Sequence, residues 1–274
     1  MCRPICCILL SFVLALTLQD GYCHELKVDT VPRHPAYLMD HGAIRRGDST
    51  SKKMAIVFTG DEFGEGGKAI MAALQKENIK ASFFFTGRFY KNPAFKALIR
   101  SLRAQGHYLG AHSNDHLLYC DWAKRDSLLV TKKQFNEDLD KNYALLKQLG
   151  ITTQSARYFL PPYEWYNDSI AAWTRERGLR LVSFSPGTLS SADYTTPKDN
   201  NYRSSEIIYT SIVNHEARQV SGLNGFILLL HIGTSPLRTD KFYKRLPQLL
   251  KWLRKRGYEP VRIDQLLEHA PKKF

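Results

Sequence analysis

From residue 54 onward, short apolar runs alternate with longer segments of helical periodicity, and this alternation is what most restricts the fold. The strand-like runs lie at Met54–Phe58, Ala81–Phe85, Tyr108–Ala111, Ala156–Leu160, Leu179–Phe184, Gly225–Leu230 and Pro260–Ile263. The helical segments lie at Gly67–Glu77, Pro93–Gln105, Lys132–Gln148, Ser169–Arg177, Ser205–Gln219 and Lys241–Arg256. Strands joined by helical crossovers pair in parallel. No Pro-, Ser- or Gly-rich linker interrupts the series, so we predict one α/β domain at residues 54–274, a (β/α) barrel of about seven strands.

The residues before this region are of two kinds. Arg3 precedes an apolar run from Ile5 to Leu18, which the polar stretch QDGYC follows. This pattern is typical of a secretory signal peptide and is short for a membrane span. We therefore predict a signal peptide at residues 1–22, an irregular lead-in at 23–53, and an exported protein in the periplasm, the envelope or the medium. An uncleaved anchor, or a lipid on Cys23, is the less favoured alternative.

Cysteine content and charge exclude some classes of protein. Removal of the signal would leave Cys120 and Cys23, which do not make a disulfide framework. The net charge of +13 suits an acidic glycan or an anionic envelope better than nucleic acid, for which the chain has no recognisable motif. Scattered surface lysines that aid solubility explain the same charge equally well. We expect a monomer.

Polar residues gather where the predicted strands end. Asp61 and Glu62 follow the first strand, HSNDH (112–116) follows the third, LPPYEW (160–165) ends the fourth, and His231 ends the sixth. In barrels and open α/β sheets the carboxyl ends of the strands form the active site. These residues are therefore expected at one rim.

The types of these residues indicate a metal site. His112 and His116 are four residues apart, so on a helical turn both imidazoles would face one way. One carboxylate from the first strand would complete three ligands and leave a position open, as in catalytic zinc sites. A lone HxxxH is structural about as often as it is a ligand pair. His231 is a candidate general acid or else a hydrogen-bonded core histidine, and the backbone N–H of Tyr163, after two prolines, is a candidate oxyanion donor or part of a rigid turn.

The motifs FTGDE, HSNDH, RYFLPPY and LLLHIG, in this order over about residues 54–265, resemble those of the polysaccharide deacetylase family, carbohydrate esterase family four. The resemblance implies a distorted (β/α) barrel that removes N- or O-acetyl groups from polysaccharides with a divalent metal, usually zinc. It implies that Asp61, His112 and His116 bind the metal. His231 would be the general acid, and the Tyr163 N–H would help to bind the oxyanion.

Two departures mark the chain as a divergent member. Gly60 stands where the family has its base, an aspartate, and Leu160 stands where the family has the arginine that holds this aspartate. Loss of the aspartate alone would leave the arginine unpaired, and loss of the arginine alone would leave the aspartate unpaired. The absence of both residues therefore indicates a remodelled site. Glu62 is the nearest substitute base, Asp115 and Glu164 are other candidates, and metal-bound hydroxide would need no dedicated base. Asp193, in ADYTTP, is the nearest candidate for the family's fourth motif.

Two functions follow from this pattern. The first is an exported metal-dependent deacetylase of a polysaccharide or oligosaccharide, with an acidic glycan as one candidate substrate. The second is a glycan-binding domain that has lost hydrolysis and stacks sugars on Tyr163, Trp165 and Tyr166. Retention of His231 favours the enzyme, because a binding module needs no proton donor.

Overall fold

Seven parallel strands form one sheet in the computed structural model, which describes residues 37–268. The strands follow the order β7-β6-β5-β4-β3-β8, and β9 pairs with the first half of β3. Their bounds are β3 Lys53–Gly60, β4 Ser82–Phe85, β5 Tyr108–Ala111, β6 Tyr158–Phe159, β7 Arg180–Leu181, β8 Ile227–His231 and β9 Glu259–Val261. The prediction of a (β/α) barrel with about seven strands is confirmed, although β6 and β7 are much shorter than the apolar runs that contain them. The predicted signal peptide lies outside the described residues.

A hairpin closes the gap between β7 and β8. Its strands, β1 (Leu38–Asp40) and β2 (Ala43–Arg46), pair in antiparallel fashion. Ile44 bridges to Val182 beyond β7, and Arg46 bridges to Phe226 just before β8. The expectation of an irregular lead-in is therefore wrong for residues 38–46. The turn residues His41 and Gly42 have φ angles of 40° and 75°, and a tight hairpin turn needs two such left-handed residues. The sequence DHG at residues 40–42 was therefore the local indication of this hairpin.

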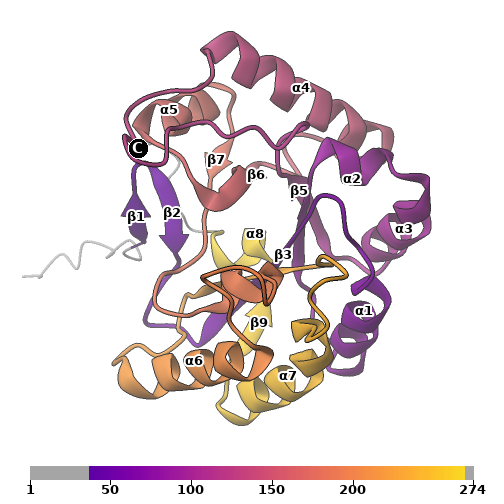
Figure 1. The fold of residues 1–274 in the computed structure, drawn as a ribbon, viewed down its shortest axis with the longest axis vertical. Helices are drawn as coiled ribbons and strands as arrows, with labels where there is room; N and C mark the ends of the chain where they lie inside the picture. The colour runs from indigo at the N-terminus through magenta and orange to yellow at the C-terminus, as the bar shows by residue number, and fades with distance from the viewer. Residues whose placement is uncertain (1–36, 269–274) are drawn as a thin grey trace, which may run out of the picture. The chain divides into compact units, whose positions relative to one another are not determined.

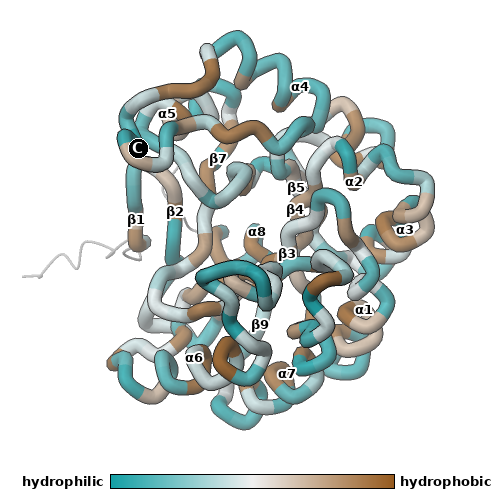
Figure 2. The backbone as a smooth tube through the Cα atoms, in the orientation of Figure 1, coloured by the Kyte–Doolittle hydropathy of each residue, from teal (hydrophilic) through white to brown (hydrophobic). Residues whose placement is uncertain are grey.

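Helices surround the sheet, as Figure 1 shows. The helices are α1 Gly67–Lys76, α2 Gly87–Lys91, α3 Lys96–Ala104, α4 Lys132–Gln148, α5 Asp168–Glu176, α6 Ser205–Arg218, α7 Leu246–Lys255 and α8 Ile263–Leu266. Short 3-10 turns occur at Pro93–Phe95, Pro162–Glu164, Ser190–Tyr194 and Phe242–Arg245. The outer sides of the larger helices are mostly hydrophilic in Figure 2, as expected of helices that cover a core. Within residues 37–268, none of the helices combines the length and hydropathy that crossing a membrane requires.

Side chains of β3 alternate between two cores. Ile56 and Phe58 pack outward, in the cluster formed with the surrounding helices. Ala55 and Val57 pack inward, with residues of the other strands and of α8. The barrel interior is therefore a packed core below the rim. The alternation continues to the end of the strand, where it decides which side chains reach the rim.

We predict that the hairpin is a stabilising part of the barrel. Ile44 is 1% exposed in the inner core, so Ile44→Ala should lower the free energy of unfolding by about 2–5 kcal/mol in urea titrations. Leu38, in the same hairpin, is 45% exposed, and Leu38→Ala should change the free energy by less than about 0.5 kcal/mol. Equal, small effects of both variants would contradict a closing role for β2.

Candidate active site

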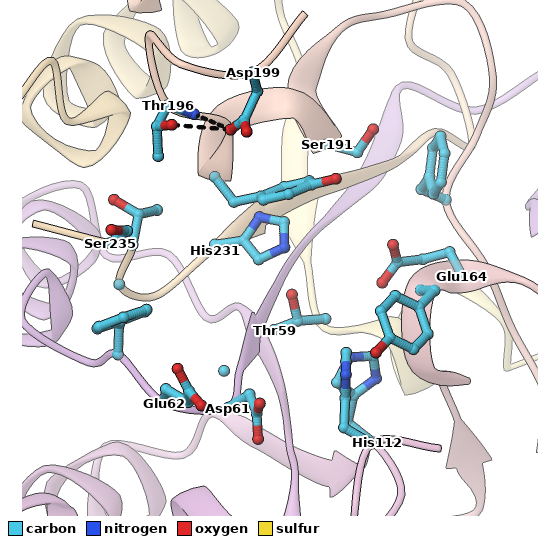
Figure 3. Close-up of a pocket in the computed structure, with 18 of the residues that line it drawn as sticks. Thr59, Asp61, Glu62, His112, Glu164, Ser191, Thr196, Asp199, His231 and Ser235 are labelled. Carbon is cyan, nitrogen blue, oxygen red and sulfur yellow. Dashed lines mark hydrogen bonds between the residues drawn. The ribbon is translucent and has the colours of Figure 1, made fainter. Parts of the chain in front are cut away.

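A pocket of about 700 Å³ opens at the carboxyl ends of β3, β5, β6 and β8. All six residues selected from the sequence line it, namely Asp61, Glu62, His112, His116, Tyr163 and His231. In Figure 3, Asp61 and Glu62 lie on one side of the cavity, His112 and Glu164 lie on another, and His231 lies above them. The barrel therefore brings together residues that are up to 170 positions apart in the chain.

A buried carboxylate on α4 shapes the loop with the two histidines. Asp138 is 3% exposed and accepts hydrogen bonds from the Ser113 hydroxyl at 2.7 Å and from the backbone N–H groups of Asn114 and Asp115 at 2.9 and 2.8 Å. The expected helical turn is not formed, because Ser113 and His116 have left-handed φ angles of 71° and 53°. Asp138 replaces helical hydrogen bonds as the organiser of this segment, and nothing in the local sequence marked it for this role.

The two imidazoles of this loop are held neutral. His112 is 3% exposed, and its Nδ1 lies 2.8 Å from the carbonyl oxygen of Leu160. Burial, and then the neighbouring His116, lower the pKa of His112 well below its usual value. Burial also lowers the pKa of His116, although Asp61 opposes that effect. The ring centroids are 5.1 Å apart, so two neutral imidazoles lie side by side, in the protonation state that binds metal ions.

Asp61 and Glu62 share one arginine. The Arg88 Nη1 lies 3.4 Å from Asp61 Oδ2 and donates to Glu62 Oε1 at 2.5 Å, while the Thr86 hydroxyl donates to Asp61 Oδ1 at 2.8 Å. Thr86 precedes α2 and Arg88 lies in it, directly beyond β4. The sequence did not single out this arginine. Arg88 supplies the two carboxylates with a positive charge, which the apolar side chain of Leu160 cannot do.

The donor types of Asp61, His112 and His116 fit a divalent cation, since two neutral imidazoles and a carboxylate form many catalytic zinc sites. Within the described part of the chain, however, no three ligand side chains lie close enough together to form a ready coordination sphere. In this arrangement the Asp61 carboxylate is held by Thr86 and Arg88. The metal role of the three residues therefore stays a prediction.

Asp193 holds His231 by two contacts. Its Oδ1 lies 2.6 Å from His231 Nδ1, and its Oδ2 accepts from the His231 backbone N–H at 3.0 Å. Burial by itself lowers the pKa of His231, but the Asp193 charge and hydrogen bond, together with Glu164, outweigh burial and raise the pKa above its usual value. The sequence identified Asp193 only as the nearest match to a fourth motif. The structure makes it the partner of the candidate acid.

Gly60 borders the pocket with its backbone, but a side chain at this position would point away from the cavity. A Cβ atom on Gly60 would lie 2.7 Å from Ile232 Cγ2, 2.9 Å from Phe85 Cδ1 and 3.0 Å from Phe89 Cε2. These three side chains belong to the outer apolar cluster. A carboxylate at position 60 would therefore enter this cluster. Leu160 is fully buried in the inner core, so neither departure position presents a side chain that faces open pocket.

The turn after β6 carries two consecutive left-handed residues. Tyr163 and Glu164 have φ angles of 57° and 51°, directly after Pro161 and Pro162. Burial raises the pKa of Glu164 to about 7, with an addition from Asp193 and against the opposing effect of His231. Consecutive residues with left-handed backbone angles at the rim of a pocket are typical of functional sites.

Aromatic rings line one wall of the pocket. The Tyr163 ring packs at 4.4 Å from His116 and at 5.6 Å from Trp122, a residue that the sequence did not single out. Trp122 is 57% exposed and also stacks on Trp165 at 5.7 Å. Tyr166, proposed from the sequence as a sugar-stacking residue, is 1% exposed and donates its hydroxyl to Asp40, so it does not reach the pocket.

The sequence was compared with known proteins. Residues 47–182 match the family model described as polysaccharide deacetylase. A protein of Geobacillus stearothermophilus, described as an uncharacterized 30.6 kDa protein, is 26% identical over 231 residues, which are 84% of this chain and 76% of that one. A peptidoglycan-N-acetylglucosamine deacetylase of Listeria monocytogenes is 26% identical over 218 residues, which are 79% of this chain and 39% of the other.

Solved structures have the same fold. A family four carbohydrate esterase of Bacillus subtilis superposes with a TM-score of 0.64 at 22% identity, over 84% of this chain and 87% of that one. A pseudoenzyme of the same esterase family from Bacillus anthracis superposes with a TM-score of 0.64 at 17% identity, over 84% of this chain and 70% of the other. At these identities the likeness establishes the fold alone.

We predict that an aspartate at position 60 destabilises the protein without increasing activity. Gly60→Asp places a charge among Ile232, Phe85 and Phe89, which should lower the free energy of unfolding by about 3 kcal/mol or more in urea titrations. Gly60→Ala, the matched control, adds a crowded methyl without a charge and should cost about 1–3 kcal/mol. A stable Gly60→Asp variant with a higher rate of acetate release would show that position 60 does reach the pocket.

Proposed function

Since this chain belongs to the polysaccharide deacetylase family, we propose that it is an exported, metal-dependent hydrolase that removes N- or O-linked acetyl groups from a carbohydrate polymer or oligosaccharide. The observation that carries the proposal is the pairing of His231 with the buried Asp193, because His231 lines the same pocket as two neutral histidines and Asp61. A domain that only binds glycan has no use for such a pair. Export rests on the sequence of residues 1–22 alone.

Asp61, His112 and His116 are proposed to hold the divalent cation, with zinc favoured by the donor types. When bound, such a cation supplies positive charge that polarises a carbonyl and acidifies water. The protein prepares the ligands for it. The Leu160 carbonyl binds His112 through Nδ1, which leaves Nε2 as the free donor atom, and Asp138 fixes the loop that carries His116.

His231 is proposed as the general acid. Its Nδ1 faces Asp193, so the proton available for transfer is on Nε2. Because its pKa is raised, the imidazole carries that proton near neutral pH and can give it to the departing amine or alkoxide. The Tyr163 N–H is proposed to bind the oxyanion, and the prolines before it restrict the backbone that positions this group.

The proposed substrate is a polymer that contains N-acetylglucosamine. The Listeria relative, and a relative from Bacillus cereus that is 23% identical over 86% of this chain, are named as peptidoglycan-N-acetylglucosamine deacetylases. Trp122 and Tyr163 offer exposed aromatic faces beside the pocket. Among the residues described, the lining has four carboxylates and no lysine or arginine, so it gives no support to an acidic glycan. That candidate rested on net charge alone.

A glycan-binding domain without hydrolysis is the second candidate. The observation that favours it is the pair of departures at Gly60 and Leu160, and one structural neighbour with this fold is itself described as a pseudoenzyme. The same comparison includes a mutant of that neighbour described as having restored enzymatic activity. The fold is therefore compatible with either state, and acetate release separates them.

We predict chelator-sensitive release of acetate from N-acetylglucosamine polymers. His231→Ala should lower kcat by about 10²–10⁴-fold, because the leaving group loses its proton donor. Metal content, measured by elemental analysis, should stay unchanged in this variant, since His231 is not a proposed ligand. Absence of acetate from every acetylated glycan tested would favour the binding domain, and full activity of His231→Ala would exclude its role as acid.

We also predict that Asp193→Asn moves the basic limb of the pH profile of kcat/KM to lower pH. A general acid works only while protonated, so activity falls as the pH rises through its pKa. The negative charge of Asp193 raises the pKa of His231, and its removal lowers that pKa. An unchanged basic limb, with the fold intact, would show that His231 does not set it.

A further inference from the structure

Hydrolysis of an acetyl group needs an acceptor for the proton of the attacking water, and position 60 does not provide one. Among the described residues, four carboxylates line the pocket, Asp61, Glu62, Glu164 and Asp199, and a fifth that we consider, Asp193, binds the lining residue His231. A carboxylate whose oxygens already accept charged or multiple hydrogen bonds is less available to a water molecule that needs an acceptor. The contacts of each carboxylate therefore rank them as proton acceptors.

Four of the five are already engaged. Asp61 and Glu62 share Arg88, and Glu62 is also 55% exposed at its side chain. Asp193 binds His231 with both oxygens. Asp199 accepts from the backbone N–H and the hydroxyl of Thr196, at 2.7 and 3.0 Å. Asp115, a further candidate from the sequence, is exposed and does not line the pocket.

Glu164 is the exception. Its side chain makes no hydrogen bond or ion pair with any residue in the range 37–268, yet it is half-buried and lines the pocket. In Figure 3 its carboxylate points into the cavity on the side where His231 lies. His231 and Asp193 are the charged groups that act on it, and Tyr194 lies close enough for Glu164 to act on its phenol in turn.

The backbone holds this carboxylate in place. Glu164 and Tyr163 both have left-handed φ angles, which cost non-glycine residues about 1–2 kcal/mol each. The turn is closed by hydrogen bonds from the Glu164 and Trp165 N–H groups to the carbonyls of Pro161 and Pro162, at 3.1 and 3.2 Å. A strained conformation that the surroundings maintain, and that aims a carboxylate into a pocket, indicates a function for that side chain.

We propose that Glu164 is the general base of this site, in place of the aspartate that the chain lacks at position 60. The inference rests on the proposed deacetylase function. Water loses a proton to the Glu164 carboxylate while its oxygen forms a bond to the acetyl carbon. The bond from that carbon to nitrogen or oxygen then breaks, and its electron pair takes the proton of His231. Acetic acid ionises and leaves as acetate together with the free amine or alcohol, and the proton on Glu164 passes through solvent to restore that of His231.

The electrostatic environment suits this exchange. Burial and the nearby Asp193 keep the pKa of Glu164 near neutrality, where a carboxylate is both ionised in part and basic enough to accept a proton. The same surroundings raise the pKa of His231. Two titratable groups that face one pocket thus have the states that a base and an acid require.

The test compares isosteric variants of the full-length protein, Glu164→Gln and Glu62→Gln, with Asp115→Asn as the control outside the pocket. Acetate release from a soluble N-acetylglucosamine oligomer gives kcat and KM, and elemental analysis and the melting temperature report metal content and folding. We expect Glu164→Gln to lower kcat by about 10²–10⁴-fold with little change in KM, and to remove the acidic limb of the pH profile. Glu62→Gln should lose less than tenfold, and Asp115→Asn should match the wild type.

Each other result has a definite meaning. A folded Glu164→Gln variant that keeps its activity overturns the inference and leaves the deacetylase proposal standing. A large loss in Glu62→Gln alone assigns the base to Glu62. If Glu164→Gln fails to fold, Glu164→Asp is the variant that decides, because it keeps a carboxylate on a side chain that is one methylene shorter. We expect this variant to have partial activity and to retain the acidic limb of the pH profile. A kcat equal to that of the wild type would contradict the proposal, because a general base must lie at the right distance from the water. No acetate from the wild type would overturn both proposals together.

Discussion

The alternation of side chains along β3 determines the layout of the site. Val57 points into the barrel core and Phe58 points outward, so Thr59 reaches the pocket and position 60 turns back toward the helices. The parallel pairing of β3 with β8 sets Thr59 level with His231. The position of β3 therefore determines where Asp61 and Glu62 lie on the rim and how far they are from His231, the candidate acid. A shift of one residue would exchange the pocket and core positions.

Groups outside the recognised motifs control the three histidines of the pocket. A backbone carbonyl holds His112, a carboxylate on α4 holds the loop with His116, and Asp193 holds His231. Identical side chains thereby take different roles. Burial without a close carboxylate partner keeps His112 neutral, whereas Asp193 keeps the proton on His231. The roles that we propose for them, metal ligand for His112 and His116 and proton donor for His231, follow from these partners.

The sequence was sufficient for the barrel and for the pocket lining, because both follow from local periodicity and from strand ends. The sequence was not sufficient where contacts between residues far apart in the chain determine the local conformation. The bridge from Ile44 to Val182, which turns a supposedly irregular segment into a strand, joins residues far apart in the chain. The loop with the histidines had helical spacing, but Asp138 imposes another conformation on it. Arg88 and Trp122 carry no motif, and only the fold brings Arg88 to Asp61 and Glu62 and Trp122 to the pocket.

The two departures from the family pattern can be understood together with Arg88 and Glu164. Leu160 puts an apolar side chain into the inner core, and the cation that approaches Asp61 and Glu62 is Arg88, from α2. Its guanidinium lies against both carboxylates, so both are already engaged with a cation of the protein. Glu164, on the other side of the pocket, has no such partner among the described residues. The pocket thus holds one carboxylate and one imidazole whose pKa values are both raised, which suits the base and the acid proposed for them.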